Sequence, residues 1–231
     1  MIKSISDQVI MKHTFLILGI FLLTITTTGC SFSNQTPEPI TDNQIENHDM
    51  SDQALNMEGI RVYNLDTNTS TLAWSAKRIA SAPHTGTVGI QSGSITFKDN
   101  IFTEGGFTMD MTTIAEDENA EALVRHISNE DFFNVERFPE SQIEIKSLEQ
   151  IEGDTYHVIA DLIIKEITNE VEFDAKIDMN QEQLTADANF DIDRTKWDIT
   201  FDSGSIFKEL GDKAIRDQIE YTIHLELTTE K

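Results

Sequence analysis

The chain has 231 residues with 41 acidic and 17 basic side chains, which gives a formal net charge of −24 at pH 7. A negative field of this size repels nucleic acids and anionic lipid surfaces, so neither is expected as a partner. The single cysteine, Cys30, excludes an internal disulfide and any metal site built from several thiolates. The length that follows residue 60 suits one domain with a substantial core.

The N-terminal region has the pattern of a bacterial lipoprotein signal peptide. Lys12 and a histidine precede the apolar stretch 15–25, which is shorter than the ~20 apolar residues of a membrane-spanning helix. Three threonines and a glycine then lead directly to Cys30, the arrangement at which lipoproteins are cut and lipidated. We predict a signal peptide over residues 1–30, with its start at Met11 and lipidation at Cys30. The alternative is an ordinary signal peptide that contains Cys30 by chance.

Residues 31–60 are rich in Ser, Asn, Gln, Asp and Glu and have no apolar period. This composition predicts a disordered tether between the anchor and the domain that follows. The expected location is the cell envelope, with the domain on the periplasmic side or at the cell surface and a lipid anchor as its only contact with the membrane.

Nine segments beyond residue 61 alternate apolar and polar side chains with a period of two. Val171 and Phe173, for example, point to the face opposite Glu172. Such a strand has one apolar and one charged face. The predicted strands are Val62–Asp66, Thr71–Ile79, Ile90–Lys98, Gly105–Thr113, Gln142–Gln150, Thr155–Ile164, Glu170–Met179, Leu184–Asp193 and Gln218–Thr228.

Short polar turns such as Asp99-Asn100 separate several of these segments, which predicts hairpins and a mainly antiparallel sheet. Because the strands are two-faced and helical segments are scarce, the apolar faces must meet in a sandwich or a closed barrel. A closed barrel of sufficient width has an apolar lumen, which favours a lipid-like ligand. One capping helix is predicted over Glu116–Ser128, and a helical turn over Ile206–Leu210 is predicted to stop at Gly211.

The inward faces of the strands supply the candidate lumen of the barrel. Its predicted lining residues are Trp74, Phe97, Phe107, Met109, Met111, Ile143, Ile145, Phe173, Phe190 and Tyr221. The alternative is that these side chains fill the barrel as a packed core. Ala175, Ala186 and Ala188 also face inward, and their small side chains are expected to leave room for a ligand.

Four cationic or titratable side chains near the predicted barrel ends are candidates to bind a polar head group: His84, Arg125, His126 and Arg194. A cation at an opening suits a phosphate or a quinone oxygen. The alternatives are a helix C-terminal cap for His126 and, for Arg194, an ion pair with an aspartate, the candidates being Asp191, Asp193 and Asp198. The histidines are too scattered for a metal site. With no nucleophile motif or phosphate loop in the sequence, an enzyme is not expected.

Several segments resemble the YceI family. The string His126–Phe133, followed by Phe138-Pro139, is similar to the signature segment of that family. Further segments agree in order: Trp74, His84 with Gly86, Met109–Ile114, Ala160–Thr168, Asp193–Trp197 and Leu210–Asp212. The resemblance covers about Val62 to Thr228. The chain departs from the family at Ala160 and Glu166, where members often carry glycine.

This resemblance implies an all-β fold over residues 61–231, an eight-stranded antiparallel lipocalin-like barrel with one capping α-helix. The segment Val62–Asp66 would then be a short edge or lead-in. Phe132 and Phe133 are expected either to pack under the helix or to form a lid over the lumen. The resemblance further implies an isoprenoid lipid or quinone as ligand, with no other cofactor and no catalysis, for storage, shielding or transport. The alternative is a stress or interaction protein with a packed barrel that binds no lipid.

Overall fold

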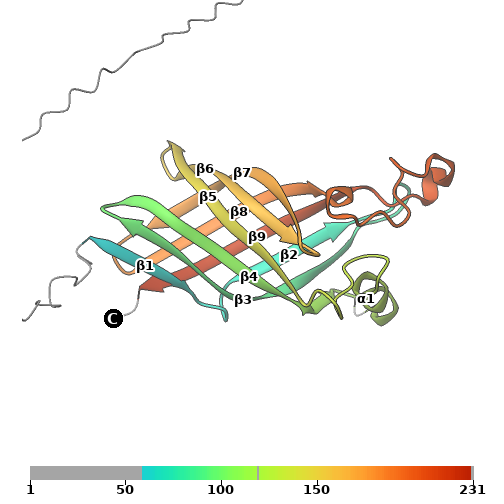
Figure 1. The fold of residues 1–231 in the computed structure, drawn as a ribbon, viewed down its shortest axis with the longest axis horizontal. Helices are drawn as coiled ribbons and strands as arrows, with labels where there is room; N and C mark the ends of the chain where they lie inside the picture. The colour runs from blue at the N-terminus through green and yellow to red at the C-terminus, as the bar shows by residue number, and fades with distance from the viewer. Residues whose placement is uncertain (1–58, 119, 230–231) are drawn as a thin grey trace, which may run out of the picture. The chain divides into compact units, whose positions relative to one another are not determined.

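The computed structural model describes residues 59–118 and 120–229 (Figure 1). The predicted signal peptide over residues 1–30, the lipidation site Cys30 and all but the end of the tether over 31–60 lie outside the described residues. Among the residues that are described, no helix combines the length and the apolar character needed to cross a membrane.

Strands make up most of the described chain. They are β1 (Ile60–Leu65), β2 (Thr71–Ala76), β3 (His84–Lys98), β4 (Ile101–Glu116), β5 (Glu140–Glu152), β6 (Thr155–Ile164), β7 (Ile167–Met179), β8 (Gln183–Asp193) and β9 (Gln218–Thr229). One α-helix, α1 (Glu121–Ser128), and two short 3₁₀ helices, η1 (Arg194–Trp197) and η2 (Lys208–Lys213), lie in the connections.

The nine strands occupy eight positions around a closed antiparallel barrel, which confirms the predicted fold class. β1 and β2 share one position, because each pairs with β3 on one side and with β9 on the other. Tyr63 in β1 lies opposite Ile95, whereas Trp74 in β2 lies opposite Gly86. The two segments are therefore halves of one broken strand, and the expectation that Val62–Asp66 is an edge or lead-in was wrong.

The capping helix begins later than predicted because Glu116 belongs to β4, where it pairs with Gly86. One carboxylate oxygen of Glu116 accepts hydrogen bonds from the backbone N–H groups of Glu118 (2.9 Å) and Ala120 (3.0 Å). This carboxylate thereby turns the chain from β4 into α1. The predicted turn over Ile206–Leu210 also differs, since η2 runs past Gly211, which forms a kink with φ of 54°.

The turn between β6 and β7 has both of its central residues, Lys165 and Glu166, at positive φ (52° and 62°). A side chain is disfavoured there and glycine is not. Glu166→Gly is therefore expected to raise the free energy of unfolding by about 0.5–1 kcal/mol, measured by urea denaturation. The matched change Glu172→Gly, in the middle of β7, is expected to lower it by a similar amount. A loss of stability in both variants would contradict the strain assigned to this turn.

Candidate functional site

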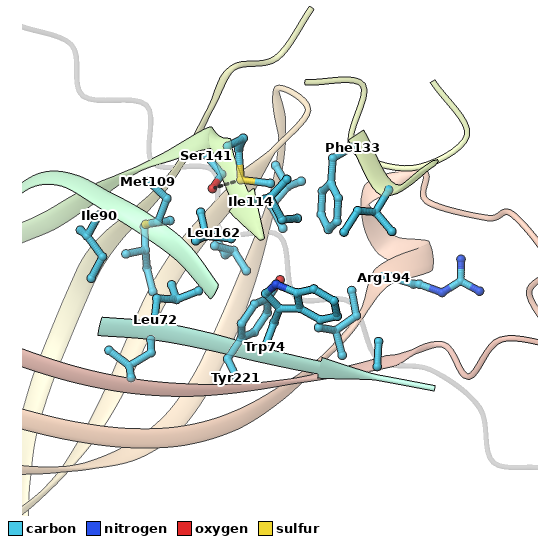
Figure 2. Close-up of a pocket in the computed structure, with 18 of the residues that line it drawn as sticks. Leu72, Trp74, Ile90, Met109, Ile114, Phe133, Ser141, Leu162, Arg194 and Tyr221 are labelled. Atoms are coloured by element: carbon cyan, nitrogen blue, oxygen red, sulfur yellow. Dashed lines mark hydrogen bonds between the residues drawn. The ribbon is translucent and has the colours of Figure 1, made fainter. Parts of the chain in front are cut away.

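The barrel interior is hollow in the half next to α1. The cavity is lined by inward side chains of β2, β3, β4, β5, β6, β8 and β9, together with Ile127 of α1 (Figure 2). It contains about 1030 Å³ of space between atoms, part of it continuous with solvent. The lining is almost wholly apolar, so the cavity suits a hydrocarbon chain.

The opposite half of the barrel is packed solid. Tyr63 of β1 meets Phe97 of β3 edge to face, with 6.0 Å between ring centres, and Phe97 meets Phe102 at 6.1 Å. Leu184 and Leu227 are also fully buried there. These side chains close the end of the barrel at which β1 begins.

Seven of the ten predicted lumen residues line the cavity: Trp74, Phe107, Met109, Met111, Ile143, Phe190 and Tyr221. The other three, Phe97, Ile145 and Phe173, do not. Phe97 belongs to the packed half, Ile145 packs against the core, and Phe173 stacks on Phe190 with 4.3 Å between ring centres. The alternation of the strands identified the inward face correctly, but it could not tell which level of the barrel is hollow.

None of the three inward alanines, at which room for a ligand was expected, belongs to the lining of the cavity. Ala175, Ala186 and Ala188 are buried, and none of them lines the cavity. On β8 the lining includes Phe190 and stops before Ala188, the next residue on the same face. The β9 partners of two of these alanines do line it, since Ile223 lies opposite Ala188 and Leu225 lies opposite Ala186.

The loop after α1 contributes to the cavity. Phe132 and Phe133 are buried and line its end, beside Ile127 of the helix. The sequence left open whether this pair packs under the helix or covers the lumen. In the structure the pair lies beside the helix and also borders the cavity. Leu162 and Ile164 of β6 also line the cavity. Neither residue was among the predicted lining residues, although the alternation of Thr155–Ile164 places them together on one face.

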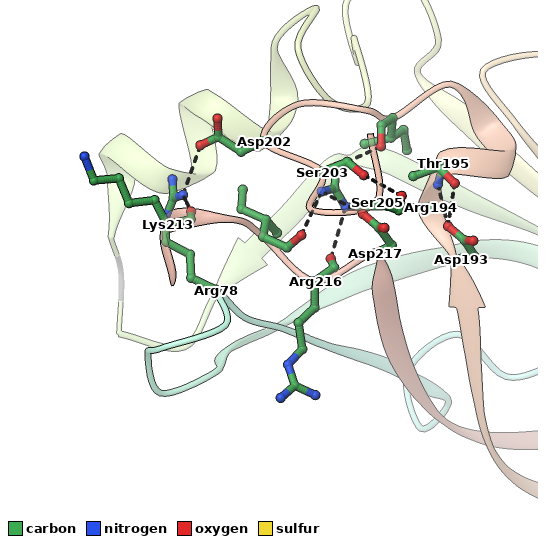
Figure 3. Close-up of polar contacts among 12 residues, drawn as sticks. Arg78, Asp193, Arg194, Thr195, Asp202, Ser203, Ser205, Lys213, Arg216 and Asp217 are labelled. Atoms are coloured by element: carbon green, nitrogen blue, oxygen red, sulfur yellow. Dashed lines mark hydrogen bonds and ion pairs between the residues drawn. The ribbon is translucent and has the colours of Figure 1, made fainter. Parts of the chain in front are cut away.

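Arg194 borders the cavity, but its guanidinium points away from it (Figure 2). The side chain is 1% exposed, and burial lowers the pKa of its guanidinium. Its N–H groups donate to three backbone carbonyl oxygens and to the carboxylate of Asp217 (Figure 3). These carbonyls belong to Ile199 (2.8 Å), Arg216 (3.2 Å) and Ile215 (3.3 Å).

The ion-pair partner expected for Arg194 was wrong. Its guanidinium lies 3.5 Å from the carboxylate of Asp217, which is more distant in sequence than any of the three candidates Asp191, Asp193 and Asp198. Asp193 instead accepts hydrogen bonds from the backbone N–H (3.0 Å) and hydroxyl (2.7 Å) of Thr195, and so caps η1.

The model of one protein family, the YceI-like domain, matches residues 63–227. The chain belongs to the YceI-like family. Among solved structures, BcnA of Burkholderia cenocepacia superposes with a TM-score of 0.57 at 18% identity, over 70% of this chain and 98% of that one. A polyisoprenoid-binding domain from Saccharophagus degradans, implicated in plant cell wall breakdown, gives 0.57 at 12% identity, over 73% and 98%. At these identities the likeness concerns the fold. A search of curated proteins returned no match.

Three predicted head-group residues of this YceI-like barrel lie outside the cavity lining. His84 is half exposed and places Nδ1 3.1 Å from a carboxylate oxygen of the buried Glu116. Hydrogen bonds from the Ala120 backbone and from His84 lower the pKa of Glu116. Arg125 lies on the exposed face of α1, 3.6 Å from Glu121.

His126, in the last turn of α1, packs edge to face against the rings of Phe132 (5.0 Å) and Phe201 (4.8 Å). Its ring therefore lies behind the lining residue Phe132. A head-group role for His84, Arg125, His126 or Arg194 stays a prediction. In the described part of this YceI-like chain, no group of three or more His, Cys, Asp or Glu side chains is arranged to hold a metal ion.

Two histidines on the outer face of the YceI-like barrel pair with carboxylates. His157 Nδ1 lies 2.9 Å from Asp174, and His224 Nδ1 lies 2.8 Å from Asp187. Their second ring nitrogens face Glu172 (3.8 Å) and Glu226 (3.5 Å), respectively. The hydrogen bonds to Asp174 and Asp187 raise the pKa of the two imidazoles above the ordinary value of 6.5.

A group whose pKa is raised by folding stabilises the folded state below its unfolded pKa, and this contribution is lost as the pH rises through the raised value. We therefore expect the melting temperature to fall as the pH rises from about 6 to about 8. The double variant His157→Gln/His224→Gln should show a smaller fall in the same scanning calorimetry series. An identical pH dependence in both proteins would show that the two pairs contribute nothing to folding.

Proposed function

We propose that this YceI-like protein binds the chain of an isoprenoid or similar amphiphilic lipid inside its barrel, while a lipid anchor on Cys30 holds it at a bacterial membrane. The observation that carries the proposal is the apolar cavity in the half of the barrel next to α1. The polyisoprenoid-binding description of the related Saccharophagus degradans domain supports the same class of ligand. The cavity also argues against the alternative of a solidly packed barrel that binds no lipid.

The lining favours an uncharged chain. No lining residue directs a charged group into the cavity, since the guanidinium of Arg194 is used by the protein itself. Burial of ten methylenes yields roughly 8 kcal/mol, and association costs about 4–15 kcal/mol. Firm retention therefore requires a chain of several isoprene units, which the space continuous with solvent allows to extend beyond the cavity.

Anchoring at Cys30 is tested by cell fractionation. The full chain is expected in the membrane fraction, because two or more acyl chains bind a bilayer stably. The Cys30→Ser variant, exported to the same compartment, is expected in the soluble fraction. Partition of both proteins into the same fraction would contradict the anchor.

The soluble Cys30→Ser chain also provides the test of the ligand. Native mass spectrometry of protein purified from a bacterial host, paired with lipid extraction of the same sample, is expected to show a discrete additional mass that matches an isoprenoid lipid. A protein that is bare, and stays bare after incubation with prenyl quinones and polyprenols, would overturn the proposal. The rate at which bound lipid passes to added vesicles separates transport from storage or shielding.

A further inference from the structure

Trp74 carries a buried polar atom that the protein leaves without a partner. Its side chain is 8% exposed and lines the cavity (Figure 2), and its indole N–H makes no hydrogen bond. Buried donors are normally paired, because an unpaired donor loses its hydrogen bonds to water without replacement. The other tryptophan follows this rule, since the indole N–H of Trp197 donates to the carbonyl of Leu162 at 3.0 Å.

The fold fixes the orientation of the Trp74 ring. Trp74 lies opposite Gly86 of β3, and a Cβ placed on Gly86 would be 2.7 Å from the indole carbon Cζ2 and 1.9 Å from the carbonyl oxygen of Ala115. The indole therefore packs directly on the backbone of β3, which only glycine permits. The indole carbon Cε2, which is bonded to the N–H nitrogen, would lie 2.8 Å from the same Cβ, so the fold fixes the N–H edge of this lining residue beside Gly86.

Tyr221 brings a second polar atom to the same level. It lies opposite Trp74 across the β2–β9 ladder and lines the cavity. Burial raises the pKa of the Tyr221 hydroxyl, which therefore stays protonated at neutral pH and can donate a hydrogen bond. The lining is apolar on both sides of this pair, with Leu72 and Leu225 in one direction and Ile219 and Phe133 in the other.

We infer that the ligand carries an uncharged acceptor oxygen, such as a carbonyl or an ether, which lies part-way along the cavity and accepts the indole N–H of Trp74. This inference rests on the proposed function and makes it more specific. A pure hydrocarbon would leave the donor unpaired. A phosphate at this level would be buried without a cation, because Arg194 donates to backbone carbonyls and to Asp217 instead, and an unpaired buried charge is strongly disfavoured.

Two matched probes test this inference on the full-length Cys30→Ser chain: a methyl ketone with a farnesyl chain, and the hydrocarbon in which a methylene replaces the carbonyl. The ketone is expected to bind about tenfold more tightly than the hydrocarbon, a difference of about 1.4 kcal/mol. In Trp74→Phe this preference is expected to disappear, whereas Trp197→Phe should keep it, because the Trp197 indole is satisfied within the protein.

A second readout is made on the unchanged protein, and a variant serves only to assign its resonances. The chain has two tryptophans, so ¹⁵N-tryptophan labelling yields two indole N–H resonances, and the Trp74→Phe spectrum assigns them. The ketone should move the Trp74 proton resonance downfield and leave that of Trp197 in place. The hydrocarbon should produce no such downfield shift.

The possible outcomes separate the inference from the proposed function. If neither probe binds, the proposed function fails and the inference fails with it. If both probes bind equally and the Trp74 resonance does not respond to the ketone, lipid binding stands, but the donor is satisfied by water and the inference is overturned. Loss of the ketone preference in Tyr221→Phe rather than in Trp74→Phe would assign the acceptor to the phenol and would likewise overturn the role of Trp74.

Discussion

Ala76→Trp is expected to lower the amount of lipid that co-purifies with the protein at least about tenfold. Ala76 is the last residue of β2 and lines the cavity. An indole at this position would occupy part of the cavity in which a chain is proposed to lie. A loss of only two or three buried methylenes, at about 0.8 kcal/mol each, already corresponds to about tenfold in affinity. Native mass spectrometry gives the ratio of bound to bare protein.

The matched control for Ala76→Trp lies on the same strand. Ala73 points to the outer face of the barrel and does not line the cavity. Ala73→Trp therefore adds the same side chain without obstructing the interior, and its lipid content should equal that of the unchanged protein. If both folded variants retained lipid to the same degree, the ligand would not be bound in this cavity.

Arg194→Leu is expected to lower the free energy of unfolding by about 3–5 kcal/mol, measured by urea denaturation. The guanidinium connects η1 to the segment 199–217 through three carbonyl oxygens and Asp217. Its removal leaves the three carbonyls without this donor and the partly buried Asp217 carboxylate without its ion-pair partner. The expected loss in the free energy of unfolding comes from these groups that lose their partner, rather than from the strength of any one hydrogen bond.

Arg216→Leu is the control for Arg194→Leu. The Arg216 side chain is exposed, while its carbonyl accepts from Arg194, so this substitution should change stability by no more than about 0.5 kcal/mol. The other possibility is that Arg194 binds a lipid head group, as the sequence suggested. In that case Arg194→Leu would reduce the affinity for lipid while its urea midpoint stayed near that of the unchanged protein.

The strands could be predicted from the sequence where the alternation is complete, and they were missed where glycine interrupts it. β6 begins and ends where predicted, at Thr155 and Ile164. β3, in contrast, starts at His84 rather than Ile90, because Gly86 and Gly89 lack the side chains that reveal a face. Glycine is needed at both positions because side chains of neighbouring strands occupy the space of a Cβ. Trp74 lies over Gly86, and Thr113 lies over Gly89.

The sequence could predict an apolar barrel interior, but not at which level of the barrel the cavity lies. Alternation places Phe97 and Phe107 on the inner surface alike, yet Phe107 lines the cavity and Phe97 closes the opposite end. The depth of a residue in a barrel depends on the stagger between distant strands, which no local pattern contains. The same holds for Arg194, whose acceptors at 215–217 become its neighbours only when β8 and β9 pair.

The first strand of the domain begins at the end of the barrel opposite the cavity. β1, the first strand, enters beside the aromatic side chains that fill one end of the barrel, and the hollow half adjoins α1 at the other end (Figure 1). If the protein is held through its N-terminal segment, as proposed, the attached end of the domain is the packed one and the cavity lies at the other end. Under the proposed anchoring, bound lipid could pass to an acceptor across the envelope while the protein remains fixed to its own membrane.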